Sequence, residues 1–122
     1  MAGTPPDATQ AAELRRLARR VPLEAQVYCR LLEGAAPAFW AQAVDISLGG
    51  ICLRTPQPLF RPARLRISLR LPGGLHRVHA TGEVTNARRD GDGVLAGLRF
   101  IELARETNVE LCRFLFGRAL EA

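Results

Sequence analysis

Hydrophobic and polar residues alternate along much of the chain with a period of two, which is typical of antiparallel strands with one buried face. The clearest run is RLRISLRL, residues 64–71, whose leucines and isoleucine are expected to face inward. Similar runs are separated by segments rich in glycine and proline, and they fall at residues 27–32, 39–47, 51–54, 76–87 and 94–102. The pattern therefore predicts about six short strands.

The second predicted strand ends in polar residues and glycines. Alternation places Trp40 and Ile46 on one face of this strand and Asp45 and Ser47 on the other. The Gly-Gly pair at residues 49–50 permits a sharp reversal into the next strand. An acid and a hydroxyl are thus expected to point the same way, beside a tight turn.

After the last strand the spacing becomes helical, and a helix is expected at about residues 103–119, with Thr107 or Asn108 as its cap. Its apolar stripe consists of Val109, Cys112, Phe116 and Leu120, with Leu111 and Leu115 beside them. Strands followed by one helix predict an all-β fold with a C-terminal helix, in the form of a small antiparallel β-barrel whose helix covers one opening.

Length and composition exclude several classes of protein. A chain of 122 residues has the size of one domain. It contains no apolar run of about 18–20 residues and no hydrophobic signal core, so we expect no membrane span and a cytoplasmic location. Three isolated cysteines and two histidines predict neither a metal site nor a disulfide framework. No nucleophile lies near a base in the sequence, so we expect no catalytic residues and no enzyme.

The charge of the chain points to an anionic partner. All 17 basic residues are arginine and they outnumber 12 acidic residues, which gives a net charge of +5. An arginine-only, alanine-rich composition is also typical of a GC-rich genome, so the charge alone does not decide the function.

Four arginines cluster in LRRLARR, at positions 15, 16, 19 and 20. Arg16 and Arg20 have R-x-x-x-R spacing, as do Arg15 and Arg19. Guanidinium groups held this close repel one another until an anion arrives, and their planar fork suits phosphate or the O6 and N7 edge of guanine. The alternative is a solvated basic arm without a ligand.

The segment VDISLGG supplies the second candidate site. The Asp45 carboxylate can accept hydrogen bonds from guanine N1–H and N2–H₂ or clamp a binding arginine, and the Ser47 hydroxyl can donate to a phosphate or ribose oxygen. Gly50 has no side chain, so a base or ribose can lie against its backbone. The alternative is a serine or aspartate turn that ends the strand and has no other role.

The order of these segments resembles the PilZ domain family, bacterial receptors for cyclic di-GMP. RRLARRVPL is followed by DISLGGICLRT and then by GLRFIEL before the C-terminal helix. Arg16 and Arg20 match the family signature R-x-x-x-R, and Asp45, Ser47 and Gly50 match [D/N]-x-S-x-x-G. The likeness extends over roughly residues 15–118.

The resemblance implies a six-stranded antiparallel β-barrel with a C-terminal helix, in residues 15–122. The prolines and glycine near the N-terminus predict a flexible tail at residues 1–14. It implies that Arg15, Arg16, Arg20, Asp45, Ser47 and Gly50 bind cyclic di-GMP, commonly as an intercalated dimer. The arginine segment would then wrap over the barrel and change the surface offered to an effector protein. No cofactor other than this ligand is implied, and whether Arg15, Arg19 or Arg99 contacts the ligand stays open.

Two other functions fit parts of the sequence. One is a protein-interaction adaptor of the pilus-assembly type that needs no nucleotide, although such adaptors generally lack the two signatures. The other is a basic barrel that binds nucleic acid through the arginine segment. The small number of aromatic residues, one Trp, one Tyr and five Phe, makes nucleic acid the weaker expectation.

Overall fold

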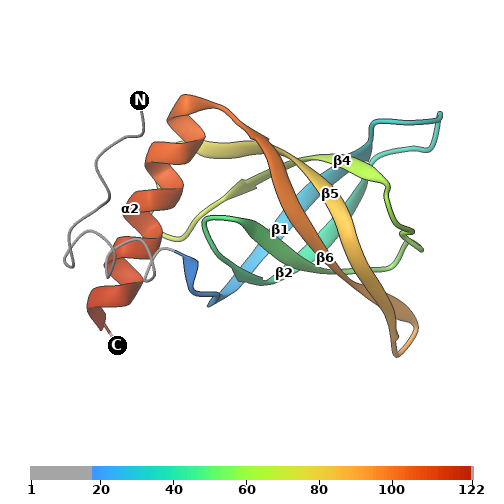
Figure 1. The fold of residues 1–122 in the computed structure, drawn as a ribbon, viewed down its shortest axis with the longest axis horizontal. Helices are drawn as coiled ribbons and strands as arrows, with labels where there is room; N and C mark the ends of the chain where they lie inside the picture. Colours follow the sequence, from blue (N-terminus) through green and yellow to red (C-terminus); the bar gives the residue numbers. More distant parts are fainter. Residues whose placement is uncertain (1–17, 122) are drawn as a thin grey trace, which may run out of the picture.

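The computed structural model describes residues 18–121, which form one closed barrel and one helix (Figure 1). The strands are β1 (Val21–Leu31), β2 (Phe39–Ile46), β3 (Gly50–Thr55), β4 (Arg64–Arg70), β5 (Arg77–Asp90) and β6 (Gly93–Leu103), followed by helix α2 (Arg105–Glu121). Neighbouring strands are antiparallel and follow the order β1-β2-β3-β6-β5-β4 around the barrel. The predicted six-stranded antiparallel barrel with a C-terminal helix is confirmed. The predicted tail, residues 1–14, lies outside the described residues, as do Arg15 and Arg16.

The inner face of the barrel follows the predicted alternation most closely in β4. Leu65, Ile67 and Leu69 are fully buried, whereas Arg64, Arg66 and Arg70 lie on the outer surface. The other strands contribute buried residues in the same way, and Leu111 and Leu115 of α2 complete the core at one end. Burial of this continuous apolar interior is the main stabilising contribution to such a domain.

The prediction that Trp40 and Ile46 share one face of β2 is wrong. Trp40 is 53% exposed and packs edge-on against Tyr28 with ring centroids 5.1 Å apart, whereas Ile46 is fully buried. The β2–β3 register shifts between Ala43 and Asp45, so the strand carries a bulge there. An extra residue reverses the inward and outward positions, and simple alternation does not reveal it. The bulge expected for a glycine of β5 does occur, between Thr81 and Gly82.

The predicted apolar stripe of α2 is also displaced. Val109, Phe116 and Leu120 are exposed, and the buried stripe runs through Thr107, Leu111 and Leu115. Each residue turns a helix by about 100°, so the two stripes differ by roughly one residue of rotation.

A contact with β5 explains the rotation of the helix. The Thr107 hydroxyl accepts a hydrogen bond of 2.9 Å from the backbone N–H of His79, which fixes that face of α2 against the strand. Thr107 is therefore an internal contact of a helix that begins at Arg105, and the predicted cap at Thr107 or Asn108 is wrong.

The two ends of the barrel differ. The β2–β3 turn lies at the end that α2 covers, while the opposite end carries the loops 32–38 and 56–63 and the β5–β6 turn (Figure 1). That turn is tighter than the predicted loop at residues 88–93, because Asp90 pairs with Gly93 and only two residues lie between them. Gly91 has a φ of +61°, a conformation that glycine adopts without strain.

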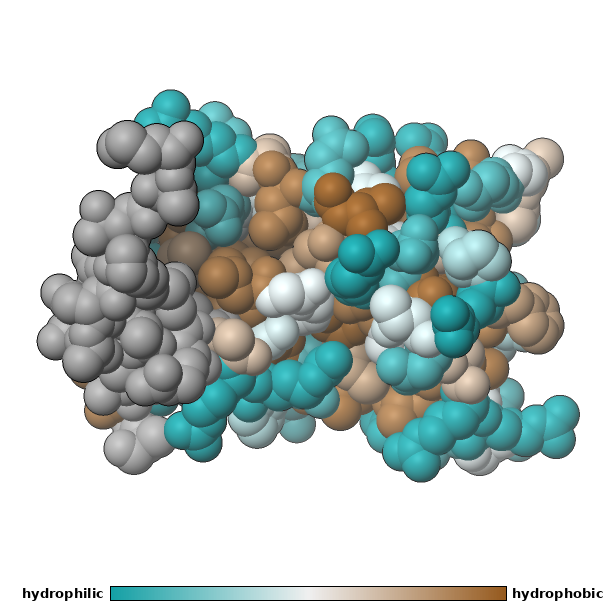
Figure 2. Space-filling model, viewed as in Figure 1, coloured by the Kyte–Doolittle hydropathy of each residue, from teal (hydrophilic) through white to brown (hydrophobic). Residues whose placement is uncertain are grey.

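The outer surface of the barrel is mixed. Figure 2 shows hydrophilic side chains interspersed with smaller apolar patches over the visible face. Within residues 18–121, no helix has both the length and the apolar character needed to span a bilayer.

The rotation of α2 can be tested by paired substitutions. Leu115 is fully buried and its neighbour Phe116 is 43% exposed. Leu115→Ala should lower the free energy of unfolding by about 2–5 kcal/mol because it leaves a cavity. Phe116→Ala should cost less than about 1 kcal/mol. Urea denaturation followed by circular dichroism measures both; equal losses would contradict the observed orientation.

Candidate functional site

The pairing of β1 with β2 brings the arginine segment to the β2–β3 turn. Val21 pairs with Ile46 and Pro22 with Asp45, so Arg20, which directly precedes β1, lies beside the end of β2. The Arg20 guanidinium donates from Nη1 to Asp45 Oδ1 at 2.6 Å. About half of the Arg20 side chain is exposed, so its remaining N–H groups are accessible to a ligand.

Ser47 is held by a compact turn. Its backbone N–H donates to the Gly50 carbonyl at 2.9 Å, and its Oγ accepts from the Gly49 N–H at 3.2 Å. Because β2 ends at Ile46, this turn, and not the strand alternation we predicted, sets the position of the Ser47 side chain. In its hydrogen bond with Gly49 the Oγ serves as acceptor, so this bond does not use the hydroxyl hydrogen, and the residue as a whole is only 7% exposed.

Close packing of β3 against β6 requires glycine at position 50. A Cβ at this position would lie 2.1 Å from the carbonyl oxygen of Leu98 on β6, which is far inside van der Waals contact. Among the described glycines, positive φ occurs only at positions 34, 73 and 91, so the predicted reversal at Gly49-Gly50 forms without the left-handed conformation. The Phe100 N–H donates to the Gly49 carbonyl at 2.8 Å and ties the turn to β6.

Three further side chains lie on the outer surface next to this turn. Cys52 pairs with Asp45, and Arg54 follows two residues later on the same face of β3. We did not predict either residue from the sequence, although alternation along β3 from Gly50 places residues 52 and 54 on one face. Arg99 pairs directly with Gly50 and forms an ion pair of 3.3 Å with Glu83, so the residue left open by the sequence lies at the candidate site.

The Cys52 thiol reports on the electrostatics of this surface. Burial raises its pKa and the nearby Asp45 carboxylate raises it further, while Arg20, Arg54 and Arg88 lower it. The net direction is upward, so the thiol is protonated at neutral pH. Three guanidinium groups therefore act on one thiol beside Asp45, and two of them, Arg20 and Arg54, are themselves paired with carboxylates.

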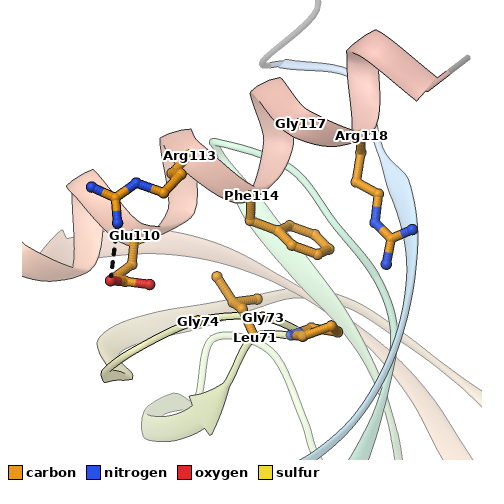
Figure 3. A pocket seen from close by; sticks show the side chains of 9 residues that line it. Leu71, Gly73, Gly74, Glu110, Arg113, Phe114, Gly117 and Arg118 are labelled. Atoms are coloured by element: carbon orange, nitrogen blue, oxygen red, sulfur yellow. Dashed lines mark ion pairs between the residues drawn. The ribbon is translucent and has the colours of Figure 1, made fainter.

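A cavity near the helix does not coincide with this site. Its volume is about 260 Å³ and it lies between the 71–74 loop and α2 (Figure 3). There Arg113 pairs with Glu110 at 3.8 Å and Arg118 stacks 5.1 Å above the Phe114 ring. Its lining contains no residue of either motif.

The site is therefore formed by an outer strand surface and a turn, with Arg20, Asp45 and Ser47 as its polar groups. Arg15 and Arg16 fall in the part of the chain that the structure does not describe, and the ligand-binding roles of all six predicted residues stay predictions. Over residues 18–121 no group of three or more His, Cys, Asp and Glu side chains could hold a metal ion.

A closed six-stranded antiparallel barrel followed by one C-terminal helix defines a known class of small β-barrel domain. The PilZ domain model matches residues 14–117 of this chain. The chain belongs to the PilZ domain family. No curated protein matches it.

Solved structures share the fold at low sequence identity. The Bacillus subtilis inhibitor of motility MotI/DgrA has 20% identity and a TM-score of 0.70, covering 84% of this chain and 50% of its own. The present chain thus spans half the length of that protein. The PilZ domain of YcgR from Escherichia coli, solved with c-di-GMP, has 20% identity and a TM-score of 0.60, covering 84% of this chain and 92% of its own.

The PilZ domain of CeSA, from a cellulose-synthesising bacterium, shows the same likeness. It has 21% identity and a TM-score of 0.58, and the match covers 85% of this chain and 99% of the CeSA domain. At these identities the likeness shows the fold.

The electrostatic arrangement around Cys52 predicts opposite effects of two substitutions. In a Cys112→Ser background, Asp45→Asn removes a charge that raises the Cys52 pKa, so more thiolate forms at pH 8 and alkylation by iodoacetamide becomes faster. Arg20→Ala removes a charge that lowers this pKa, so alkylation becomes slower.

Each change should be about threefold, and mass spectrometry measures it. Cys29 does not interfere, because burial raises its pKa to about 12. Rates that move in the same direction in both variants would contradict the arrangement.

Proposed function

We propose that this protein binds cyclic di-GMP in a bacterial cytoplasm and acts as a sensor or adaptor that regulates a partner protein. The observation that carries the proposal is the ion pair between Arg20 and Asp45, which joins the two family motifs at the Ser47 turn. Both motifs belong to a chain of the PilZ family, and the YcgR domain of the same fold was solved with this nucleotide.

Arg20 is suited to the anionic part of this ligand. A guanidinium has five N–H donors in a fixed fork, and the hydrogen bond to Asp45 uses one of them. The remaining donors can form paired bonds to a phosphate or to the O6 and N7 edge of guanine. Asp45 holds the fork in place, which reduces the entropy that Arg20 loses on binding.

Asp45 and Ser47 supply the complementary groups. The second carboxylate oxygen of Asp45 can accept the N1–H and N2–H₂ donors of a guanine, a pattern that distinguishes guanine from adenine. The Ser47 hydroxyl can donate to a phosphate oxygen while its own oxygen accepts from Gly49. Gly50 contributes indirectly, because the absence of a Cβ lets the turn that carries Ser47 pack against the Leu98 backbone of β6.

Arg15 and Arg16 complete the proposed site from the segment that precedes Arg20. A cyclic dinucleotide carries two phosphates, and an intercalated dimer carries four, so several guanidinium groups are needed to neutralise it. Binding would draw this segment onto the barrel and change the surface that an effector protein meets. The Bacillus subtilis neighbour, an inhibitor of motility, is an example of a regulatory protein that contains this fold.

Calorimetric titration with cyclic di-GMP tests the proposal. We expect a dissociation constant in the micromolar range or below. Arg20→Ala and Ser47→Ala should weaken binding by about 10- to 100-fold, because each removes a hydrogen bond that involves a charged group. Arg20→Lys should recover only part of the loss, since an ammonium lacks the planar fork.

Matched controls separate ligand contacts from folding. Arg30 is an exposed arginine at the far end of β1, so Arg30→Ala should leave the affinity unchanged. The exposed Arg20–Asp45 pair stabilises the fold by about 0–1 kcal/mol, so Arg20→Ala should remain folded. Absence of binding at millimolar nucleotide, or equal binding by Arg20→Ala and the unaltered protein, would refute the proposal.

A further inference from the structure

The barrel end opposite α2 carries an apolar groove that has no part in the nucleotide site. Its volume is about 460 Å³. One wall comes from the β3–β4 loop and the other from the β5–β6 hairpin, which extends beyond the rest of the barrel (Figure 1). The lining consists of Pro58, Leu59, Phe60, Arg61, Ala87, Arg88, Arg89 and Val94. The mouths of β-barrels are frequent positions of binding sites.

The loop wall combines a buried anchor with an exposed aromatic ring. Leu59 is almost completely buried in the core, which fixes the loop to the barrel. Phe60, the next residue, is 72% exposed. A large aromatic side chain that faces water beside an apolar groove is typical of a surface that a partner covers.

The hairpin wall includes a free strand edge. The ladder between β4 and β5 ends where Arg64 pairs with Glu83, and one further backbone bond joins Val84 N–H to Ala63. Residues 86–90 of β5 pair with β6 on one side, and no other described strand pairs with them. Their other edge can receive an extended peptide through main-chain hydrogen bonds.

The charge of the groove selects the partner. Arg61, Arg88 and Arg89 are all exposed, and none of them forms an ion pair with a carboxylate in the described part of the chain. The hairpin carries two acidic residues, of which Asp90 is engaged by Arg54 at 2.6 Å and Asp92 lies in the turn. The rim therefore presents unneutralised positive charge around an apolar floor.

We propose that this groove binds an extended acidic segment of a partner protein, with one apolar side chain in the groove and carboxylates against the arginines. A second copy of this chain would bring its own Arg88 and Arg89 against the same arginines, and like charges across a strand pair are destabilising. Nucleic acid would satisfy the guanidinium groups, but it has no peptide N–H and C=O groups that could continue the ladder along the free edge of residues 86–90.

The proposal does not depend on nucleotide binding. The groove lining includes neither Arg20 nor Asp45. Its Arg88 does act electrostatically on Cys52 beside Asp45, so Phe60→Ser is the variant that tests the groove without changing the charge near the nucleotide site.

Selection from a random heptapeptide library displayed on phage, against the full chain without nucleotide, tests the proposal. We expect enrichment of peptides with one large apolar residue flanked by Asp or Glu. An enriched peptide, synthesised with a fluorescent label, should bind more weakly as salt rises. Its addition should shift the backbone amide resonances of residues 58–61 and 86–90.

Two variants and a matched control sharpen the test. Arg88→Glu with Arg89→Glu should weaken the labelled peptide at least about tenfold, and Phe60→Ser should weaken it without changing its salt dependence. Arg30→Glu with Arg66→Glu makes the same change of net charge on another exposed surface and should alter the affinity less than about threefold.

Failure to enrich acidic–apolar peptides would overturn the proposal, as would resonance shifts confined to other residues. Equal losses of peptide affinity in the Arg88→Glu, Arg89→Glu variant and in the Arg30→Glu, Arg66→Glu control would show only non-specific attraction. That result would also overturn the proposal. Oligothymidylate serves as the nucleic-acid probe. If it binds to the unaltered protein and not to the Arg88→Glu, Arg89→Glu variant, the groove is assigned to nucleic acid instead.

Discussion

The candidate site depends on the register between β1 and β2. Pairing of Val21 with Ile46 determines that the residue before β1 emerges beside the β2–β3 turn. A slip of one residue would turn the inward side chains of β1 outward and move Arg20 away from Asp45. Burial of Leu23 and Val27 prevents that slip, so the same core that stabilises the barrel also holds the two motifs together.

Much of the fold could be predicted because most of its strands have one buried face and one solvent-exposed face. The alternation in β4 needed no other information. The bulge after Ala43 could not be predicted, because it depends on how β2 meets β3 and leaves the local composition unchanged. The rotation of α2 was missed for a similar reason, since its buried stripe includes Thr107, a polar residue whose hydrogen bond to His79 exists only in the folded protein.

The residues of the site could be predicted from the sequence, but the structural reason for each of them could not. The motif residues Arg20, Asp45 and Ser47 are within one small region, as their spacing suggested. Gly50, however, is explained by the backbone of Leu98 without reference to any ligand. A motif can thus combine residues needed for binding with residues needed for the turn. Only their contacts in the folded protein distinguish the two kinds. Cys52 and Arg54 lie outside the motif and were found through strand pairing.

The pairing of Arg20 with Asp45 has a consequence for discrimination among anions. The arginine already has an intramolecular carboxylate as its counterion, at 2.6 Å. A simple ion such as chloride can bind only the N–H groups of Arg20 that Asp45 leaves free, and it offers nothing to the carboxylate. A guanine nucleotide of the proposed kind brings donors for the carboxylate together with acceptors for the guanidinium, so it would interact with both partners of the pair while the pair stays formed. Under the proposed function, the internal salt bridge would therefore favour a ligand whose base and phosphate act together over a simple ion.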